Sequence, residues 1–335
     1  MVLRWTFSKK DGGVRPIVIG YRPTLRRLAA KVVNNIAVDK LTPLLAPNQV
    51  GVGVAHGMEA AVHATRTYVQ QLPPDSAVVK LDFRNAFNSV RRDVMLDAVR
   101  ASLPEAYHFI HSAYSSTSHL LYGDDVVQSN EGVHQGDPLG PLCLAIHPLL
   151  ANCAAELRIG YLDDITLGGD TTELAQAVDT LRCEAAKMGL FLNENKCELM
   201  RASSPSALTA SHHIFANFTE VNIHDATLLG SPLSSLAATD KALEARVNDL
   251  KTAASRLQFL HAHDALVILK HSLSVPKLLH ILRSSFCGNH PALLSSDEEL
   301  RCCLSQTLNV TLDDAQWLQA SLPVRDGGLG IRRAN

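Results

Sequence analysis

The spacing of hydrophobic and polar residues predicts strands mixed with helices in the first two thirds of the chain and helices alone in the last third. Strands are expected at 77–83 and 196–200, and hairpins at 9–20, 120–128 and 159–168. Helices are expected at 25–39 (with a stripe of Leu28, Val32 and Ile36), 58–70, 91–115 with a break near Pro104, 139–157 and 172–188. This order predicts a mixed α/β body followed by a C-terminal helical subdomain.

In the helical last third, the pattern after Leu236 predicts one helix capped by Asp240 and a second capped by Asp264. Pro276 is expected to end the second helix, because proline lacks the amide hydrogen that a helix interior needs.

Composition describes a folded chain, since 46% of the 335 residues are hydrophobic and 19% are charged. The length suggests two or three domains or subdomains. The net charge of −2 hides an asymmetry: the first 40 residues carry nine basic and two acidic groups, and the rest of the chain carries −9. A basic segment of this kind is typical of a phosphate-binding surface or, equally, of a solvated helix face.

Seven cysteines without a Cys-x-x-Cys pair argue against a disulfide scaffold and a zinc knuckle. They are typical of reduced thiols in an intracellular protein. The first 30 residues have no apolar core of the signal-peptide kind. The longest apolar stretch, 141–155, is too short and too polar to cross a bilayer, so no membrane association is expected.

Two groups of carboxylates stand at the ends of predicted strands. Asp82 ends the run 78–83, and the adjacent Asp163 and Asp164 lie at the turn of the 159–168 hairpin. If both meet at one sheet edge, three carboxylates would suit Mg²⁺, and two ions could hold the attacking and leaving oxygens of a phosphoryl transfer. Taken alone, however, an Asp-Asp pair in a hairpin is usually only a turn.

Between these groups lies the segment 133–141, Val-His-Gln-Gly-Asp-Pro-Leu-Gly-Pro. Two glycines and two prolines specify a tight turn, and a glycine lets another backbone or a base approach closely. An ordinary entry into a helix explains the glycines and prolines as well, but it does not explain Gln135.

At these residues the chain resembles the reverse transcriptases of non-LTR (LINE-type) retrotransposons, over nearly its whole length. GGVRPIVIG and LRRLAAK look like finger motifs, and VKLDFRNAFNSV and YLDDITLGG look like the two catalytic blocks. HQGDPLGPL resembles the template and nucleotide block, GLFLNENKCEL a later palm block, and LLGSPL the primer grip.

The resemblance implies an α+β right-hand polymerase with fingers, a palm built on an antiparallel sheet, and a helical thumb. Fingers are expected at 1–76, with 90–128 returning to them, and the palm at 77–89 and 129–236. Residues 237–335 would form the thumb and a truncated C-terminal region, and the chain is interpreted as a fragment or a decayed copy of a longer element.

The resemblance also assigns roles to residues. The metal ligands would be Asp82, Asp163, Asp164 and the carbonyl of Phe83, with two Mg²⁺ ions that Mn²⁺ could replace. The incoming dNTP would be bound by Lys9, Lys10, Arg15, Arg84, Phe87, Gln135 and Lys196, with Phe87 as the gate against a ribose 2′-hydroxyl. The template backbone would meet Arg26, Arg27, Lys31, Gly136 and Pro138, and the primer grip would be Leu229, Gly230 and Ser231.

The leading hypothesis is therefore a retrotransposon RNA-directed DNA polymerase that extends a DNA primer on an RNA template with dNTPs, inside the cell in the nucleus or cytoplasm. One alternative is a catalytically impaired remnant that still binds nucleic acid. The other is an RNA-directed RNA polymerase, which Phe87 disfavours. The sequence leaves the oligomeric state open.

Overall fold

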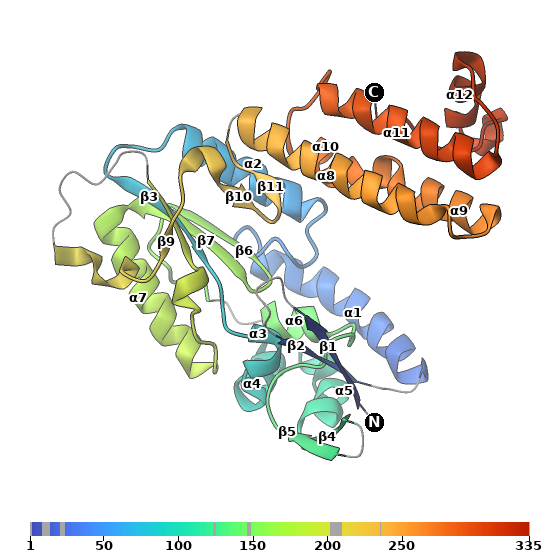
Figure 1. Cartoon of the computed structure of the whole chain (residues 1–335). Coiled ribbons are helices and arrows are strands. Elements are labelled where there is room, and N and C mark those ends of the chain that lie inside the picture. Colours follow the sequence, from blue (N-terminus) through green and yellow to red (C-terminus); the bar gives the residue numbers. More distant parts are fainter. Residues whose placement is uncertain are drawn as a thin grey trace. The chain divides into compact units, whose positions relative to one another are not determined.

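The computed structural model describes residues 2–8, 14–20, 24–122, 125–145, 149–201, 210–234 and 236–334, with 2–8 and 14–20 described as backbone. The chain divides into two compact units, residues 1–221 and 222–335. Each unit is described by itself (Figure 1).

The first unit alternates strands and helices. In chain order they are β1 (Val2–Ser8), β2 (Val14–Gly20), α1 (Thr24–Leu45), α2 (Gly57–Gln70), β3 (Ser76–Leu81), α3 (Ala86–Ser89), α4 (Arg92–Ser102), α5 (Pro104–Tyr114), β4 (Ser118–Tyr122), β5 (Asp125–Ser129), α6 (Gly140–Ala145), β6 (Leu157–Tyr161), β7 (Asp164–Asp170), α7 (Thr171–Lys187), β8 (Glu198–Arg201) and β9 (Thr219–Glu220), with 3-10 turns at Glu194–Lys196 and Ala210–Phe215.

A five-stranded sheet in the order β6-β7-β3-β8-β9 is the framework of this unit (Figure 1). The first four strands are antiparallel, and β9 is a short parallel addition to β8. β3 lies in the centre, and its residues 76–79 are all buried, as expected of a strand covered on both faces. Helix α7 packs against β3 and β7, and α2 packs against β6. The hairpin expected at 159–168 is confirmed as β6–β7.

A second sheet has the order β2-β1-β4-β5. It joins the N-terminal hairpin to the β4–β5 hairpin expected at 120–128, although the two are about 100 residues apart in the chain. The N-terminal hairpin is also confirmed, but its strands start at Val2, and the turn expected at Asp11-Gly12 lies outside the described residues.

Helix α1 differs from the sequence prediction in both length and orientation. It continues from Thr24 to Leu45, six residues past the expected end, because Ala37, Leu41 and Leu45 supply a buried face at four-residue spacing. The stripe by which the helix was identified is exposed, with exposed fractions of 59% for Leu28, 55% for Val32 and 60% for Ile36. Periodicity identified the helix but not the side that packs.

The long helix expected at 139–157 is wrong beyond Ala145. Among the described residues of this range, only α6 is helical; residues 149–152 are in turns, and Leu157 starts β6 instead. Leu142, Leu150 and Cys153 still belong to the same hydrophobic core, so the apolar run packs together without forming one helix. Leu157 pairs with Gly168 of β7, and this strand pairing replaces the helix that the apolar run predicted.

The second unit is helical after a small hairpin. It contains a 3-10 turn at Ile223–Asp225, β10 (Thr227–Leu228), β11 (Ser231–Pro232), α8 (Leu236–Leu257), α9 (Ala262–Ile268), a π-helical turn at Leu269–Leu273, α10 (Val275–Ser284), α11 (Pro291–Leu308), α12 (Asp314–Ser321) and a 3-10 turn at Val324–Asp326. Helix α8 packs against α10 and α11. The expected C-terminal helical subdomain is thus confirmed.

The three start and stop signals expected in this unit are wrong. Asp240 lies inside α8, where its carboxylate pairs with His290 Nε2 at 2.8 Å. Asp264 lies in the first turn of α9, whose N-cap is His261. Pro276 lies in the first turn of α10, a position that tolerates proline because the first amide hydrogens of a helix have no partner inside it.

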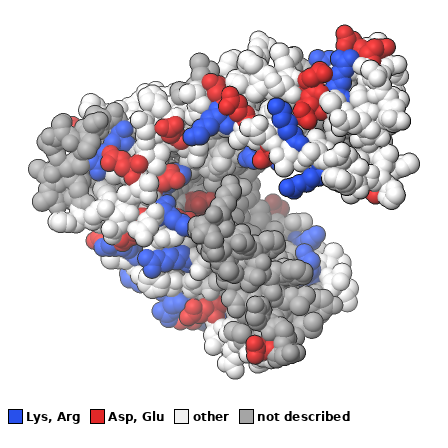
Figure 2. Space-filling view, viewed as in Figure 1, with Lys and Arg blue, Asp and Glu red and all other residues white. Residues whose placement is uncertain are grey.

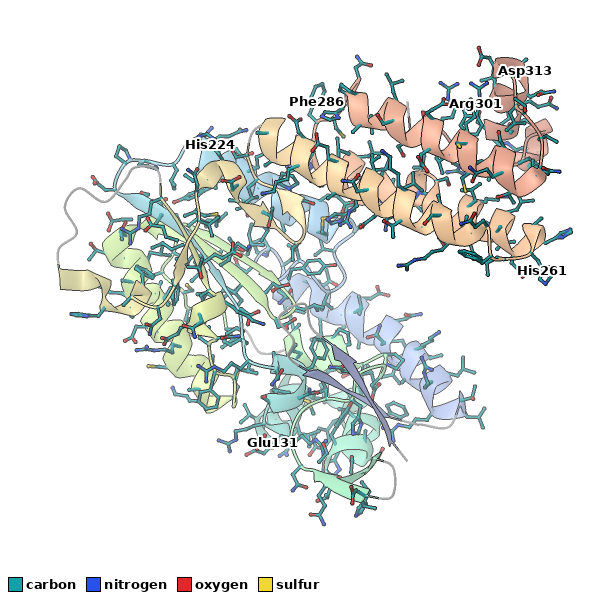
Figure 3. All side chains as sticks on the ribbon, viewed as in Figure 1. Glu131, His224, His261, Phe286, Arg301 and Asp313 are labelled. Atoms are coloured by element: carbon teal, nitrogen blue, oxygen red, sulfur yellow. The ribbon has the colours of Figure 1, made fainter. Side chains whose placement is uncertain are left out.

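Side chains at both ends of the helical unit are visible in Figure 3. Phe286, after α10, and His261, before α9, project at opposite ends, and Phe286 is 89% exposed. Asp313 begins α12 with a reciprocal capping box with Gln316. Arg301 of α11 connects α11 to the start of α12, because it donates hydrogen bonds to the Asp314 carboxylate and to the Leu312 carbonyl.

By length and composition, one helical stretch of the described residues, Ala262–Ser284, could cross a membrane. One third of its most apolar window is buried in the helical unit, and Leu269, Leu273, Leu278 and Ile281 are among the buried residues of the stretch. A core helix of a globular protein passes the same test, so the stretch alone is weak evidence for a membrane span.

Candidate active site

Asp82 lies directly beyond the end of the central strand β3. Its carbonyl oxygen accepts a hydrogen bond from the Asn193 amide at 2.8 Å, and its own amide donates to the Cys197 sulfur at 3.4 Å. The next residue, Phe83, is buried and forms a β-bridge with Leu192. Residues 82 and 83 are therefore held at fixed positions by the segment that leads into β8.

Asp163 and Asp164 belong to the β6–β7 hairpin, as the sequence predicts. Tyr161 pairs with Asp164, so the turn consists of Leu162 and Asp163. The last pair of the β3–β7 ladder is Leu81 with Ile165. Asp82 follows Leu81 and Asp164 precedes Ile165, so these two residues lie side by side where the two strands end. The structure thus brings the two groups of carboxylates together.

The three carboxylates act on one another electrostatically. Asp164 keeps an exposed edge, but the surrounding protein removes part of its hydration, and this raises its pKa. The negative charges of Asp163 and Asp82 raise it further, to about 6, against a smaller opposite effect of Lys80. The site therefore concentrates negative charge that nearby cations balance only in part.

Metal binding can be tested on this arrangement. Among the described residues, no three His, Cys, Asp or Glu side chains are gathered closely enough to enclose a metal ion. The donor chemistry nevertheless fits, because carboxylate oxygens are the ligands that hard divalent cations prefer. In addition, the charges of Asp163 and Asp82 disfavour the ionised form of Asp164, and a bound cation would offset this repulsion. Asp82, Asp163 and Asp164 would hold such an ion after their side chains turn toward it.

A cavity of about 950 Å³, partly open to solvent, lies beside these carboxylates. Its lining includes seven of the predicted site residues: Asp82, Phe83, Arg84, Phe87, Gln135, Asp163 and Lys196. Asp164 is not part of the lining. Arg84 and Lys196 are exposed cations, so one cavity presents positive and negative groups together, as a metal-bound triphosphate would require.

The loop 132–139 carries Gln135 into this cavity and is held from beneath by residues that sequence analysis did not single out. The Tyr114 hydroxyl donates to the Asp137 carboxylate at 2.8 Å and accepts from the His134 amide at 3.3 Å. The other Asp137 oxygen accepts from the Leu139 amide at 3.1 Å. Tyr114 is almost fully buried, so these bonds fix the loop from inside the core.

Arg92 extends this support. Its buried guanidinium donates to the carbonyls of Gly132 and Ser129, each at 2.9 Å, and lies over the Tyr114 ring at 5.6 Å. The sequence signal that could have identified it is weak, because an Arg at the start of a helix is usually a surface residue.

The predicted template residues partly converge. Arg26, Arg27, Gly136 and Pro138 lie together around one shallow hollow, where α1 meets the 132–139 loop. The guanidinium of Arg26 lies 5.5 Å from the centre of the Phe109 ring. Lys31 is exposed on the same helix.

The other predicted basic residues are less well placed. Lys9 and Lys10 lie outside the described residues, and of Arg15 only the backbone position on β2 is described. In Figure 2, the described Lys and Arg side chains on the visible face alternate with Asp and Glu and do not form one continuous basic field.

The predicted primer grip is the β10–β11 hairpin of the second unit. Leu229 and Gly230 form its two-residue turn, both with positive φ, of 49° and 80°. Ser231 is fully buried, where its hydroxyl meets His280 Nε2 at 3.0 Å and Ser284 Oγ at 2.7 Å. The outward-facing part of this hairpin is therefore the turn, not the serine side chain.

Comparisons with known proteins identify the family and the fold. The family model for reverse transcriptase (RNA-dependent DNA polymerase) matches residues 7–260. No curated protein sequence matches the chain.

Among solved structures, apo telomerase from Candida tropicalis matches 91% of the chain and 62% of its own at 12% identity, with a TM-score of 0.51. Telomerase from the same species in complex with the TWJ fragment of telomeric RNA (12% identity, 93% and 62% coverage, TM-score 0.46) is also similar. The telomerase of Candida albicans with that fragment matches at 11% identity (91% and 59% coverage, TM-score 0.46). The chain spans about 60% of the length of these telomerases, and the first match supports a shared polymerase fold of the reverse-transcriptase type.

Proposed function

Because the chain belongs to the reverse transcriptase (RNA-dependent DNA polymerase) family, a family of nucleotidyltransferases, we propose that it extends a DNA primer on an RNA template with dNTPs. One observation carries this proposal. Asp82, Asp163 and Asp164 meet at the edge of the central sheet, and two of them line a cavity that also contains Arg84, Gln135 and Lys196.

We propose that two Mg²⁺ ions, which Mn²⁺ could replace, bind at Asp82, Asp163, Asp164 and the Phe83 carbonyl. When bound, such ions would lower the pKa of the primer 3′-hydroxyl and stabilise the charge of the leaving pyrophosphate. The chain itself positions the reactants: Arg84 and Lys196 would bind the triphosphate, and Gln135 would contact the nucleotide from the opposite loop. The N-terminal cations Lys9, Lys10 and Arg15 would complete the triphosphate site.

A non-LTR (LINE-type) retrotransposon is the proposed source of the activity, since the motif order from GGVRPIVIG to LLGSPL resembles that group over nearly the whole chain. The fingers, palm and thumb boundaries given above are part of the same proposal. We also propose that the protein works in the nucleus or cytoplasm, where nucleic acids and dNTPs are present.

A primer-extension assay on an RNA template tests the activity. We expect Mg²⁺-dependent dNTP incorporation by the wild-type chain and a loss of roughly a thousandfold in Asp163→Asn, since one metal ligand is removed. Asp75→Asn, an exposed loop aspartate of the same unit, serves as the matched control and should keep full activity. A folded wild type without incorporation would favour the non-catalytic remnant. Salt-sensitive binding alone would not discriminate, because both alternatives predict it.

Phe87 distinguishes a DNA polymerase from an RNA polymerase. It is half-buried in the cavity wall, and its carbonyl accepts from the Val133 amide at 2.7 Å, which fixes it against the Gln135 loop. Phe87→Val should admit ribonucleotides by opening space at the sugar 2′ position, and the ratio of dNTP to rNTP incorporation measures this. An unchanged ratio would show that Phe87 is only a wall residue.

A further inference from the structure

The side chain of Gln49 lies against the hairpin that carries Asp163 and Asp164. Its Nε2 donates to the Leu162 carbonyl at 3.1 Å, while its Oε1 accepts from the Leu162 amide at 2.8 Å and from the Gly51 amide at 3.0 Å. One primary amide thus engages both backbone polar groups of a single turn residue, from a loop 113 positions earlier in the chain.

The backbone around Gln49 is laid on the same hairpin. The Val50 amide donates to the Gly160 carbonyl at 2.8 Å, the Gly160 amide donates to the Asn48 carbonyl at 2.6 Å, and Gln49 forms a parallel β-bridge with Gly160. The loop approaches the hairpin so closely that position 51 requires glycine, because a Cβ at Gly51 would lie 2.6 Å from the Leu162 amide nitrogen. The loop and the hairpin are therefore packed as one piece.

Leu162 needs this support. Its φ of 58° lies in the left-handed region, which leucine rarely adopts. Of the two turn residues it alone has a positive φ, a conformation for which hairpin turns normally use glycine, asparagine or aspartate. Nothing within the turn sequence favours the conformation, whereas the Gln49 amide satisfies the Leu162 amide and carbonyl in it.

We propose that Gln49 is a positioning residue for catalysis. By holding Leu162, it fixes the direction in which the neighbouring carboxylates of Asp163 and Asp164 leave the turn. This inference rests on the proposed polymerase function. Gln49 uses both ends of its amide on the hairpin, so its role is to orient the carboxylates and not to bind primer or template.

The test compares Gln49→Ala and Gln49→Glu with the wild-type chain in single-nucleotide primer extension. Misplacing a catalytic group by about 1 Å can lower a rate by about two orders of magnitude. The kcat of Gln49→Ala should therefore fall about 10- to 100-fold, while the KM for primer–template should change less than threefold. Gln49→Glu keeps the acceptor but turns a carboxylate oxygen toward the Leu162 carbonyl and adds negative charge near Asp163, so its kcat should fall at least as far as that of Gln49→Ala. Gln70→Ala, an exposed glutamine of α2, is the matched control.

A rescue variant separates positioning from general stability. Because glycine adopts the left-handed conformation without support, the loss of kcat on Gln49→Ala should be several-fold smaller in a Leu162→Gly background than in the wild-type background. Hydrogen exchange of the 157–165 peptide, which needs no activity, should be faster in Gln49→Ala than in Gln70→Ala.

The outcomes are distinguishable. An active wild type whose kcat and hydrogen exchange are unchanged by Gln49→Ala would overturn the inference and leave the proposed function intact. An equal loss of kcat in both backgrounds would also overturn it. A folded wild-type chain without metal-dependent incorporation would overturn the proposed function itself.

Discussion

The two units of the protein each contain a hairpin with a two-residue turn that begins with leucine in the left-handed conformation. In the β6–β7 hairpin the turn is Leu162-Asp163, and in the β10–β11 hairpin it is Leu229-Gly230. The first is supported by a side chain from a distant loop, Gln49. The second is supported by its own flanking residue, Ser231, which is buried against α10.

The difference matches the roles that the sequence resemblance implies, metal binding for the first hairpin and primer contact for the second. The β6–β7 turn presents carboxylates, whose direction depends on the backbone beneath them, and the backbone is accordingly bonded from outside. The β10–β11 turn presents an exposed Gly230 backbone, and the polar side chain beside it is turned inward. Where side chains carry the function, the turn backbone beneath them is held by hydrogen bonds, as Gln49 holds Leu162. Where the turn backbone itself is exposed, the residue next to the turn is buried, as Ser231 is.

The largest effect on stability is expected from the Ser231 hydroxyl. It donates to Ser284 Oγ, which donates to the His280 carbonyl, and the ring closes if His280 carries its proton on Nε2 and donates to Ser231. Ser231→Ala removes a fully buried hydroxyl from this ring and should cost about 1–3 kcal/mol in the free energy of unfolding of the second unit. Urea unfolding followed by fluorescence of Trp317, which is buried in the same unit, measures it.

The same variant sharpens the comparison between the hairpins. If the β10–β11 turn is the primer grip, as the resemblance implies, Ser231→Ala should raise the KM for primer more than it lowers kcat, the reverse of the effect expected for Gln49→Ala. Ser295→Ala, an exposed serine of α11 in the same unit, should change neither quantity. If Ser231→Ala instead lowers kcat alone, the two hairpins do not divide their roles in the way proposed here.

A smaller effect is expected at Gly230. Its φ of 80° disfavours any side chain, and a Cβ there would lie 3.3 Å from His280 Nε2. Gly230→Ala should therefore lower the free energy of unfolding by about 1 kcal/mol. Gly288→Ala is the matched control, because a Cβ at that position meets nothing within 4 Å. Equal thermal unfolding of the two variants would show that the turn does not require glycine.

The sequence predicted much of the first hairpin and little of the second. Asp163 and Asp164 were visible because two charges interrupt an apolar run, and the alternation around them identified two strands. What held them was not visible: Gln49, Tyr114 and Arg92 are polar residues whose partners lie far away in the chain, and no local pattern indicates such bonds.

The failures of the sequence analysis share a physical cause. Spacing identified helix α1, but the side that packs is decided by what lies next to it, so the apolar stripe through Val32 proved exposed. The apolar run after Leu139 divides between α6 and β6, because pairing with β7 recruits Leu157. Asp240 was expected to cap a helix and instead pairs with His290, fifty residues later. Tertiary contacts override local preference in each case.

The smallest effect concerns one buried thiol in each unit and tests how rarely the core around that thiol opens to solvent. Burial raises the pKa of Cys197, next to Asp82, to about 11, and burial also raises the pKa of Cys287 after α10. Since the thiolate is the reactive form, a pKa of about 11 leaves on the order of one thiolate in a thousand at pH 8. Exposed Cys183 and Cys302 provide one control in each unit.

Iodoacetamide at pH 8 should therefore modify Cys183 and Cys302 first. Mass spectrometry of the peptides would show Cys197 reacting about a hundredfold more slowly, and Cys287 also more slowly than the two controls. Raising the pH by one unit should increase the Cys197 rate about tenfold, because its thiolate fraction rises while the pH is still below its pKa. Cys197 is 0% and Cys287 6% exposed, so Cys197 should be the slower of the two. If Cys197 reacts as fast as Cys183, the end of β3 opens in solution, and the frame that places Asp82 beside the hairpin is not held closed.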